Sequence, residues 1–202
     1  MLAYPTGTVS TLIESKNVSV PTRQALQQRM AGTHTDKPLF LNEPSFGTLR
    51  AICGRLIQRD GTAGQVDIAG QIDSALADGT GNGWRYDALP PDAQTYQLGL
   101  EGCDQTASVF FGALFVQLED IQQDSVLRAV QQGNAPGNVW QKIPSTLFFK
   151  VLLAFAVEIC YGHPLVQESI GYAGMADVPG WQLLELNQLE AREPRLLPTK
   201  NG

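Results

Sequence analysis

The feature that most constrains the fold is an apolar stretch at residues 143–160, which contains Pro144, Lys150 and Glu158. A membrane-spanning helix needs about 20 residues with almost no charge, so this stretch does not fit one. Proline suits the first turn of a helix, and a helix is therefore predicted at about 144–162. Its apolar positions surround most of the helix: Leu147, Phe148, Val151, Leu152, Phe155, Ile159 and Cys160. A helix of this kind is expected in the middle of the core.

Helical periodicity also dominates the rest of the chain. Apolar residues recur three and four positions apart in residues 46–57, in 67–78 and in about 91–112, as on one face of a helix. Further helices are predicted at about 119–132 and at 21–30. The helix at 91–112 is expected to pack on one side only, through the stripe Tyr96, Leu100, Cys103, Ala107, Phe110 and Phe111.

Local signals mark several ends of these helices. Asn42 or Ser45 can cap the helix at 46–57, and Asp67 begins the helix at 67–78. Gly79 and Gly133 follow the predicted ends of two helices, where glycine is favoured. The alternation typical of strands is not sustained anywhere, so we predict an all-α fold of about five or six helices around the central one.

A single domain is expected for residues 1–202, because this length and 43% hydrophobic residues are enough for one core. Within it, residues 1–40 are predicted to form an N-terminal extension with a short helix, and residues 41–162 the helical core. Glycine, proline and aromatic residues are frequent in residues 163–202, which are therefore predicted to form an irregular C-terminal arm.

The charge balance bears on the partners of the chain. The sequence has 14 Lys and Arg against 20 Asp and Glu, a net charge of −6, and no basic run. We therefore expect no nucleic acid partner and no binding to an anionic membrane. The N-terminus has neither a signal-peptide pattern nor a twin arginine, so we expect a cytoplasmic protein, or a periplasmic one only if it is exported with a partner.

Two groups of residues could carry chemistry. The glycine-rich segment 79–83 follows a helix and lacks G-x-G-x-x-G spacing, so we interpret it as a connecting loop without a cofactor. Cys160, His163 and Glu168 could form a nucleophile with its base, or three metal ligands. The simpler interpretation makes Cys160 a buried thiol and places His163 at a helix C-terminus, where it meets free carbonyl groups. The chain has only two histidines, which weighs against acid–base catalysis.

The C-terminal part carries the most specific motif. Residues 160–164 are Cys-Tyr-Gly-His-Pro, residues 168–174 are Glu-Ser-Ile-Gly-Tyr-Ala-Gly and residues 179–181 are Pro-Gly-Trp. This pattern resembles the small third subunit of gluconate 2-dehydrogenase and of related bacterial flavin-dependent sugar and alcohol dehydrogenases. The resemblance extends to residues 46–76 and 147–150.

The resemblance implies a non-catalytic accessory subunit that has no cofactor or metal of its own. In this family the small subunit binds a large flavoprotein of the glucose–methanol–choline oxidoreductase type, which carries FAD, and in some members a cytochrome c completes the complex. The implied partner-binding residues lie in the motif: His163, Pro164, Glu168, Ile170, Gly171, Tyr172, Gly174 and Trp181.

Ile170, Tyr172 and Trp181 are expected at the centre of this contact, because large aromatic side chains are frequent interface anchors. The competing hypothesis is an independent helical enzyme that uses Cys160, His163 and Glu168. Co-purification with a flavoprotein would separate the two hypotheses.

Overall fold

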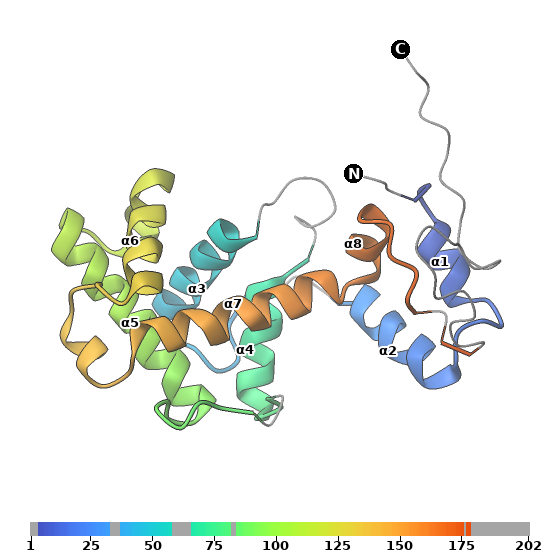
Figure 1. Ribbon diagram of the computed structural model, residues 1–202, viewed down its shortest axis with the longest axis horizontal. Coiled ribbons are helices and arrows are strands. Elements are labelled where there is room, and N and C mark those ends of the chain that lie inside the picture. The colour runs from blue at the N-terminus through green and yellow to red at the C-terminus, as the bar shows by residue number, and fades with distance from the viewer. Residues whose placement is uncertain (1–3, 33–36, 58–65, 82–83, 176, 179–202) are drawn as a thin grey trace, which may run out of the picture. The chain divides into compact units, whose positions relative to one another are not determined.

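The protein is described by a computed structural model. It describes residues 4–32, 37–57, 66–81, 84–175 and 177–178. In these ranges the structure has eight α-helices, short 3-10 helices and no strand, which confirms the all-α prediction (Figure 1). The number of α-helices exceeds the five or six expected. Over the same ranges, every helix is too short or too polar to cross a membrane.

The chain divides into two compact units, which we describe separately. The terminal unit consists of Met1–Thr33, Asp60–Val66 and Cys160–Gly202. The central unit consists of His34–Arg59 and Asp67–Ile159. The interpretation of the whole chain as one domain stays a prediction.

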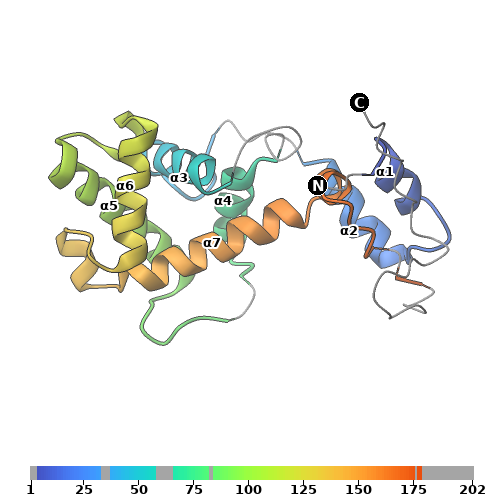
Figure 2. The ribbon, with the colours of Figure 1, turned by 45° about the horizontal axis from the view of Figure 1, so that its top comes forward.

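The central unit contains five of the six helices that the periodicity predicts, and two 3-10 helices between them (Figures 1 and 2). They are α3 (Glu43–Leu56), α4 (Ile68–Asp78), α5 (Asp92–Phe111), η2 (Phe115–Gln117), α6 (Asp120–Gln132), η3 (Asn138–Gln141) and α7 (Ser145–Tyr161). Helix α3 contacts α4, α5 and α6, and α5 also contacts α6. The final two residues of α7 belong to the terminal unit.

Close packing against α5 holds the core of the central unit together. Phe148 of α7 is 1% exposed and forms an edge-on contact with Tyr96 of α5, with ring centroids 6.2 Å apart. A Cβ atom on Gly99 would overlap the Phe148 ring, and one on Gly102 would overlap the ring of Trp140. Glycine at these two positions of α5 therefore permits the close approach of two aromatic side chains.

The predicted helix ends agree with the structure because capping is a local interaction. The Asn42 side chain accepts a hydrogen bond from the Ser45 N–H at 2.8 Å, and Asp67 accepts one from Gly70 at 3.2 Å. Gly79 and Gly133 follow α4 and α6 with φ of 64° and 80°, in the left-handed region that glycine tolerates best.

Two details of the predicted core are wrong. Phe110 and Phe111 do not continue the buried stripe of α5, since they are 43% and 39% exposed. The outer face of α7 is also not enclosed, because Val157 is 37% and Tyr161 48% exposed. Helical spacing shows which residues share a face of a helix, but it does not show how much of that face other elements cover.

The terminal unit contains α1 (Thr8–Ile13), α2 (Val20–Met30) and α8 (Pro164–Ser169), and α8 contacts both of the others. Helix α2 confirms the short helix predicted at 21–30. The other two helices were not predicted, and α8 lies in the segment expected to be irregular. Each has six residues, too few for a periodic pattern. The unit buries one small apolar cluster: Val9, Leu12, Ile13, Val18, Leu26, Ala173 and Met175.

Candidate functional site

Glu168, a predicted partner-binding residue, binds the backbone of the same unit. Its carboxylate accepts hydrogen bonds from the N–H groups of Gly7 at 3.0 Å and Val9 at 2.8 Å. Its carbonyl oxygen also accepts the N–H of Tyr4 at 3.2 Å. The first amides of a helix lack partners within it, so the buried carboxylate caps α1 and holds it to α8.

His163 caps the start of α8. Its Nδ1 accepts the N–H of Leu165 at 3.3 Å, and Pro164 occupies the first turn of the helix. We predicted that His163 would meet carbonyl groups at the end of the preceding helix. That prediction is wrong for the Nδ1 atom, which accepts a backbone N–H at the start of the next helix. The prediction failed because the segment after Pro164 was not recognised as a helix.

The environment of His163 favours the neutral imidazole. Burial lowers the pKa of His163, and the nearby positive charge of Arg29 lowers it further, while a hydrogen bond to the backbone of Arg29 opposes the shift. The guanidinium of Arg29 donates a hydrogen bond to the carbonyl of Gly162 at 2.9 Å, which places it beside the turn before α8. An imidazole that accepts a hydrogen bond at Nδ1 must be unprotonated there.

Cys160 is a buried thiol, as predicted, and is 1% exposed. Burial raises the pKa of this thiol and so disfavours the reactive thiolate. His163 and Glu168 are each hydrogen-bonded to backbone amides rather than to Cys160. Over the ranges that the structure describes, no three His, Cys, Asp or Glu side chains are grouped so that they could hold a metal ion.

The other predicted partner-binding residues differ in exposure. Tyr172 is 51% exposed, whereas Pro164 is buried, and the remaining three in the described part are half-buried: Ile170, Gly171 and Gly174. Tyr172 bends over Gly174, where a Cβ atom would overlap its phenol ring. Trp181 lies outside the described residues.

Asp177 is a second capping residue of the terminal unit, and sequence reasoning missed it. Its carboxylate accepts hydrogen bonds from the backbone and hydroxyl of Ser19 and from the hydroxyl of Thr22, all at 2.7 Å. These donors hold the pKa of Asp177 far below its usual range. The carboxylate ties the segment after α8 to the start of α2.

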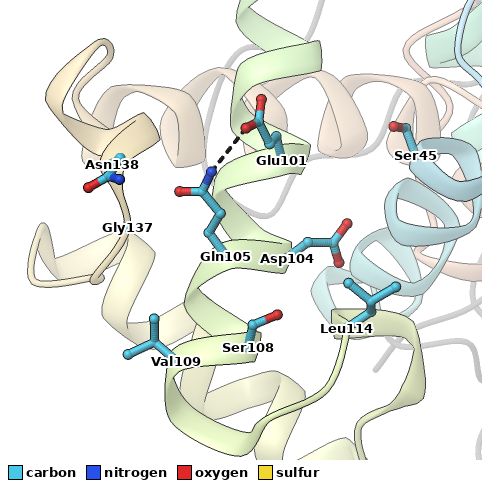
Figure 3. Close-up of a pocket in the computed structure, with 9 residues that line it drawn as sticks. All are labelled: Ser45, Glu101, Asp104, Gln105, Ser108, Val109, Leu114, Gly137 and Asn138. Carbon is cyan, nitrogen blue, oxygen red and sulfur yellow. Dashed lines mark hydrogen bonds between the residues drawn. The ribbon is translucent and has the colours of Figure 1, made fainter.

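A shallow groove of about 610 Å³ runs along the outer face of α5 in the central unit (Figure 3). Residues of α5 spaced as one helix face form its floor: Glu101, Asp104, Gln105, Ser108 and Val109. Ser45 and Leu114 border it on one side, and Gly137 and Asn138 on the other. The groove lies outside the stripe of α5 that was predicted to pack, and the sequence analysis did not foresee it.

Asp104 is the most constrained side chain of this groove. Its carboxylate accepts hydrogen bonds from the N–H of Phe115 at 3.0 Å and the hydroxyl of Thr48 at 3.3 Å. Burial raises the pKa of Asp104, and these two hydrogen bonds oppose the shift. Glu101, in contrast, is exposed and accepts a hydrogen bond from Gln105 at 2.9 Å (Figure 3).

Comparison with known protein families gives a match over most of the chain. A family model described as gluconate 2-dehydrogenase subunit 3 matches residues 43–180, which is more than half of the chain. The match begins at the first residue of α3 and includes the motif at 160–174. No curated protein and no solved structure matches the chain.

Proposed function

The chain belongs to the gluconate 2-dehydrogenase subunit 3 family, and we propose from this membership that it is a non-catalytic small subunit. It binds and stabilises a large flavin-dependent subunit of the glucose–methanol–choline type, which oxidises a sugar or an alcohol. FAD belongs to that partner, and this chain has no cofactor of its own. The match over residues 43–180 is the observation that carries the proposal.

The surroundings of the motif support this function over an independent enzyme. Catalysis by Cys160, His163 and Glu168 would need an activated thiol and a base close to it. The acceptors on His163 and Glu168 instead bind backbone amides, and burial disfavours the thiolate of Cys160. Residues that fix helix ends can shape a surface without touching a substrate.

The proposed contact with the large subunit includes the exposed ring of Tyr172, together with Ile170 and Trp181. His163 and Glu168 contribute to it by positioning the turn that carries Tyr172. A cytochrome c is a further proposed partner, as in some members of the family. We propose a cytoplasmic complex unless the partner directs both subunits to the periplasm.

Expression of the chain with and without a flavoprotein of this type from the same genome tests the function. The flavoprotein should co-purify with the chain, gain solubility and show FAD absorbance with dehydrogenase activity. The chain alone should bind no flavin and show no activity. Activity of the isolated chain that disappears in Cys160→Ala would contradict the proposal and support the enzyme.

Two matched substitutions test the contact at the motif. Tyr172→Ala should weaken binding of the large subunit. Tyr161→Ala is the control, because it changes a tyrosine of similar exposure outside the predicted set, and it should leave binding unchanged.

Trp181→Ala should weaken association by roughly 2 kcal/mol if its ring fills a pocket of the partner. Unchanged affinity with a lower melting temperature would instead mean that the side chain packs within this subunit.

A further inference from the structure

The end of α5 exposes an unusual concentration of apolar side chains. Fourteen large hydrophobic residues are exposed in the described part of the chain, and five of them fall within residues 109–116. We call these five residues the α5–η2 corner: Val109, Phe110, Phe111, Leu114 and Val116. Their exposed fractions range from 39% to 64%. Grouped exposed apolar residues are typical of protein interaction sites, while single ones are not.

The backbone of this corner is held in place from inside. Phe115 is 0% exposed and anchors η2 in the core, and its N–H donates to Asp104. The side chain of Gln123 donates to the carbonyl of Phe115 at 3.0 Å, and the N–H of Leu114 donates to the side chain of Gln117 at 3.0 Å. The apolar side chains are therefore presented by an ordered turn, which reduces the entropy lost when a partner binds.

The corner is continuous with the groove along α5. Val109 and Leu114 both line the groove, and the rings of Phe110 and Phe111 contact each other edge-on with centroids 5.9 Å apart. A partner that covers the corner would thus also meet the groove floor, where the polar groups include the carboxylates of Glu101 and Asp104.

The charges around the corner indicate what can cover it. The residues that line the adjoining groove include two carboxylates, those of Glu101 and Asp104, and no Lys, Arg or His. On the other side of the corner, Arg50 and Arg55 of α3 lie beside Val116, and Arg55 is paired with Asp124 and Asp120 at 2.8 and 2.6 Å. A second copy that docked groove to groove would bring the carboxylates of Glu101 and Asp104 together, which is unfavourable. An apolar surface with Lys or Arg at its border is complementary to the corner.

We propose that the α5–η2 corner and the adjoining acidic groove are a docking surface for the large subunit. The corner receives an apolar patch of that subunit, and Lys or Arg side chains bordering the patch meet Glu101 and Asp104. This inference rests on the proposed function, and it adds a contact in the central unit to the one proposed at the motif of the terminal unit.

The apolar part is tested with the double substitution Phe110→Ser/Phe111→Ser. Affinity for the co-expressed large subunit should fall at least tenfold, while circular dichroism shows the helix content unchanged. Val20→Ser is the matched control, since Val20 is 61% exposed on α2 of the terminal unit, and it should bind as the unchanged chain does.

The charged part is tested with Glu101→Lys, which should weaken binding severalfold at low salt and less at high salt, because salt screens exposed charges. Glu158→Lys, on the exposed face of α7, is its control and should have no effect. Wild-type affinity of both the serine and the lysine variants would overturn the inference. A wild-type dimer that the serine variant converts to a monomer would also overturn it, since a second copy would then cover the corner.

Failure of this inference and failure of the proposed function give different results. If the unchanged chain does not bind any flavoprotein of this type, the proposed function is wrong. If the unchanged chain binds and all corner variants bind equally well, the function stands and only this surface is wrong.

Discussion

The two units of the molecule are stabilised in different ways. The central unit buries many large apolar side chains completely, among them Leu100, Phe115 and Phe148. Among its described residues, the terminal unit has a small apolar cluster, and charged side chains bind its backbone: Glu168, Asp177 and Arg23. Arg23 alone donates to the carbonyls of Ile13, Ser15 and Val18 at 2.8, 2.7 and 3.3 Å.

The difference follows from size. A small unit buries a smaller fraction of its apolar surface, so hydrogen bonds to the backbone contribute relatively more to its stability. The central unit also uses this device: buried Asp73 accepts the N–H groups of Leu39, Phe40 and Leu41, and Asp104 accepts that of Phe115. The two units therefore differ in how much their stability depends on carboxylates that bind the backbone.

Removal of a core ring should have the largest effect, and only in the central unit. Phe148→Ala should destabilise that unit by about 3–5 kcal/mol, because it deletes a fully buried ring and leaves a cavity against Tyr96 and Trp140. Urea unfolding followed by amide exchange measures this for each helix. Phe155→Ala, at a half-buried position of the same helix, should cost less. Equal losses in α1 and α2 would mean that the units unfold together.

Loss of the buried Glu168 carboxylate should destabilise the terminal unit and leave the central unit unchanged. Glu168→Gln should destabilise the terminal unit by about 2 kcal/mol, because the amides at Gly7 and Val9 both lose a charged acceptor and one of them then faces an NH2 donor. Amide exchange in α1 should accelerate while that in α5 stays the same. Glu158→Gln, which changes an exposed carboxylate, is the control. Slow exchange in α1 of the Glu168→Gln variant would show that the apolar cluster is sufficient.

Glycine substitutions sharpen the comparison within the central unit. Gly99→Ala should destabilise it by about 1–3 kcal/mol, because the added methyl group would overlap the Phe148 ring. Gly47→Ala, in α3 with nothing within 4 Å of the added atom, should stabilise by about 0.5–1 kcal/mol, since alanine favours the helix. Thermal unfolding of both variants measures the two effects. Stabilisation by Gly99→Ala would contradict the close packing of α5 and α7.

A change of pH should give the smallest effect and should act on the terminal unit. Burial lowers the pKa of His163 below that of the unfolded chain, about 6.5; a hydrogen bond to the backbone of Arg29 opposes the shift, and the charge of Arg29 adds to it. The neutral imidazole therefore stabilises the folded state above pH 6.5, and this stabilisation is lost as the pH falls and the imidazole becomes protonated. Amide exchange of α8 should accelerate between pH 7.5 and 5.5, after correction for intrinsic rates, and this change should be reduced in His163→Asn. An equal response in α5 would assign the effect to another group.

Much of the central unit could be predicted from the sequence, and much of the terminal unit could not. The five longer helices and their caps at Asn42 and Asp67 depend on residues three or four positions apart. Helices α1 and α8 are too short to show a period, and His163 was expected at the end of a helix although it also caps the start of one. The motif at 160–174 was recognised, but the hydrogen bonds made by His163 and Glu168 were not.

The sequence by itself determined the all-α class, the positions of the longer helices and the family, because helical periodicity, capping and motif spacing are local properties of the chain. Only the tertiary structure decided that Glu168 caps a helix about 160 residues earlier, and that Phe110 and Phe111 face water. Which side chain meets which backbone amide, and where the cover over a helix ends, depends on how distant segments pack. Spacing along the chain does not specify that packing.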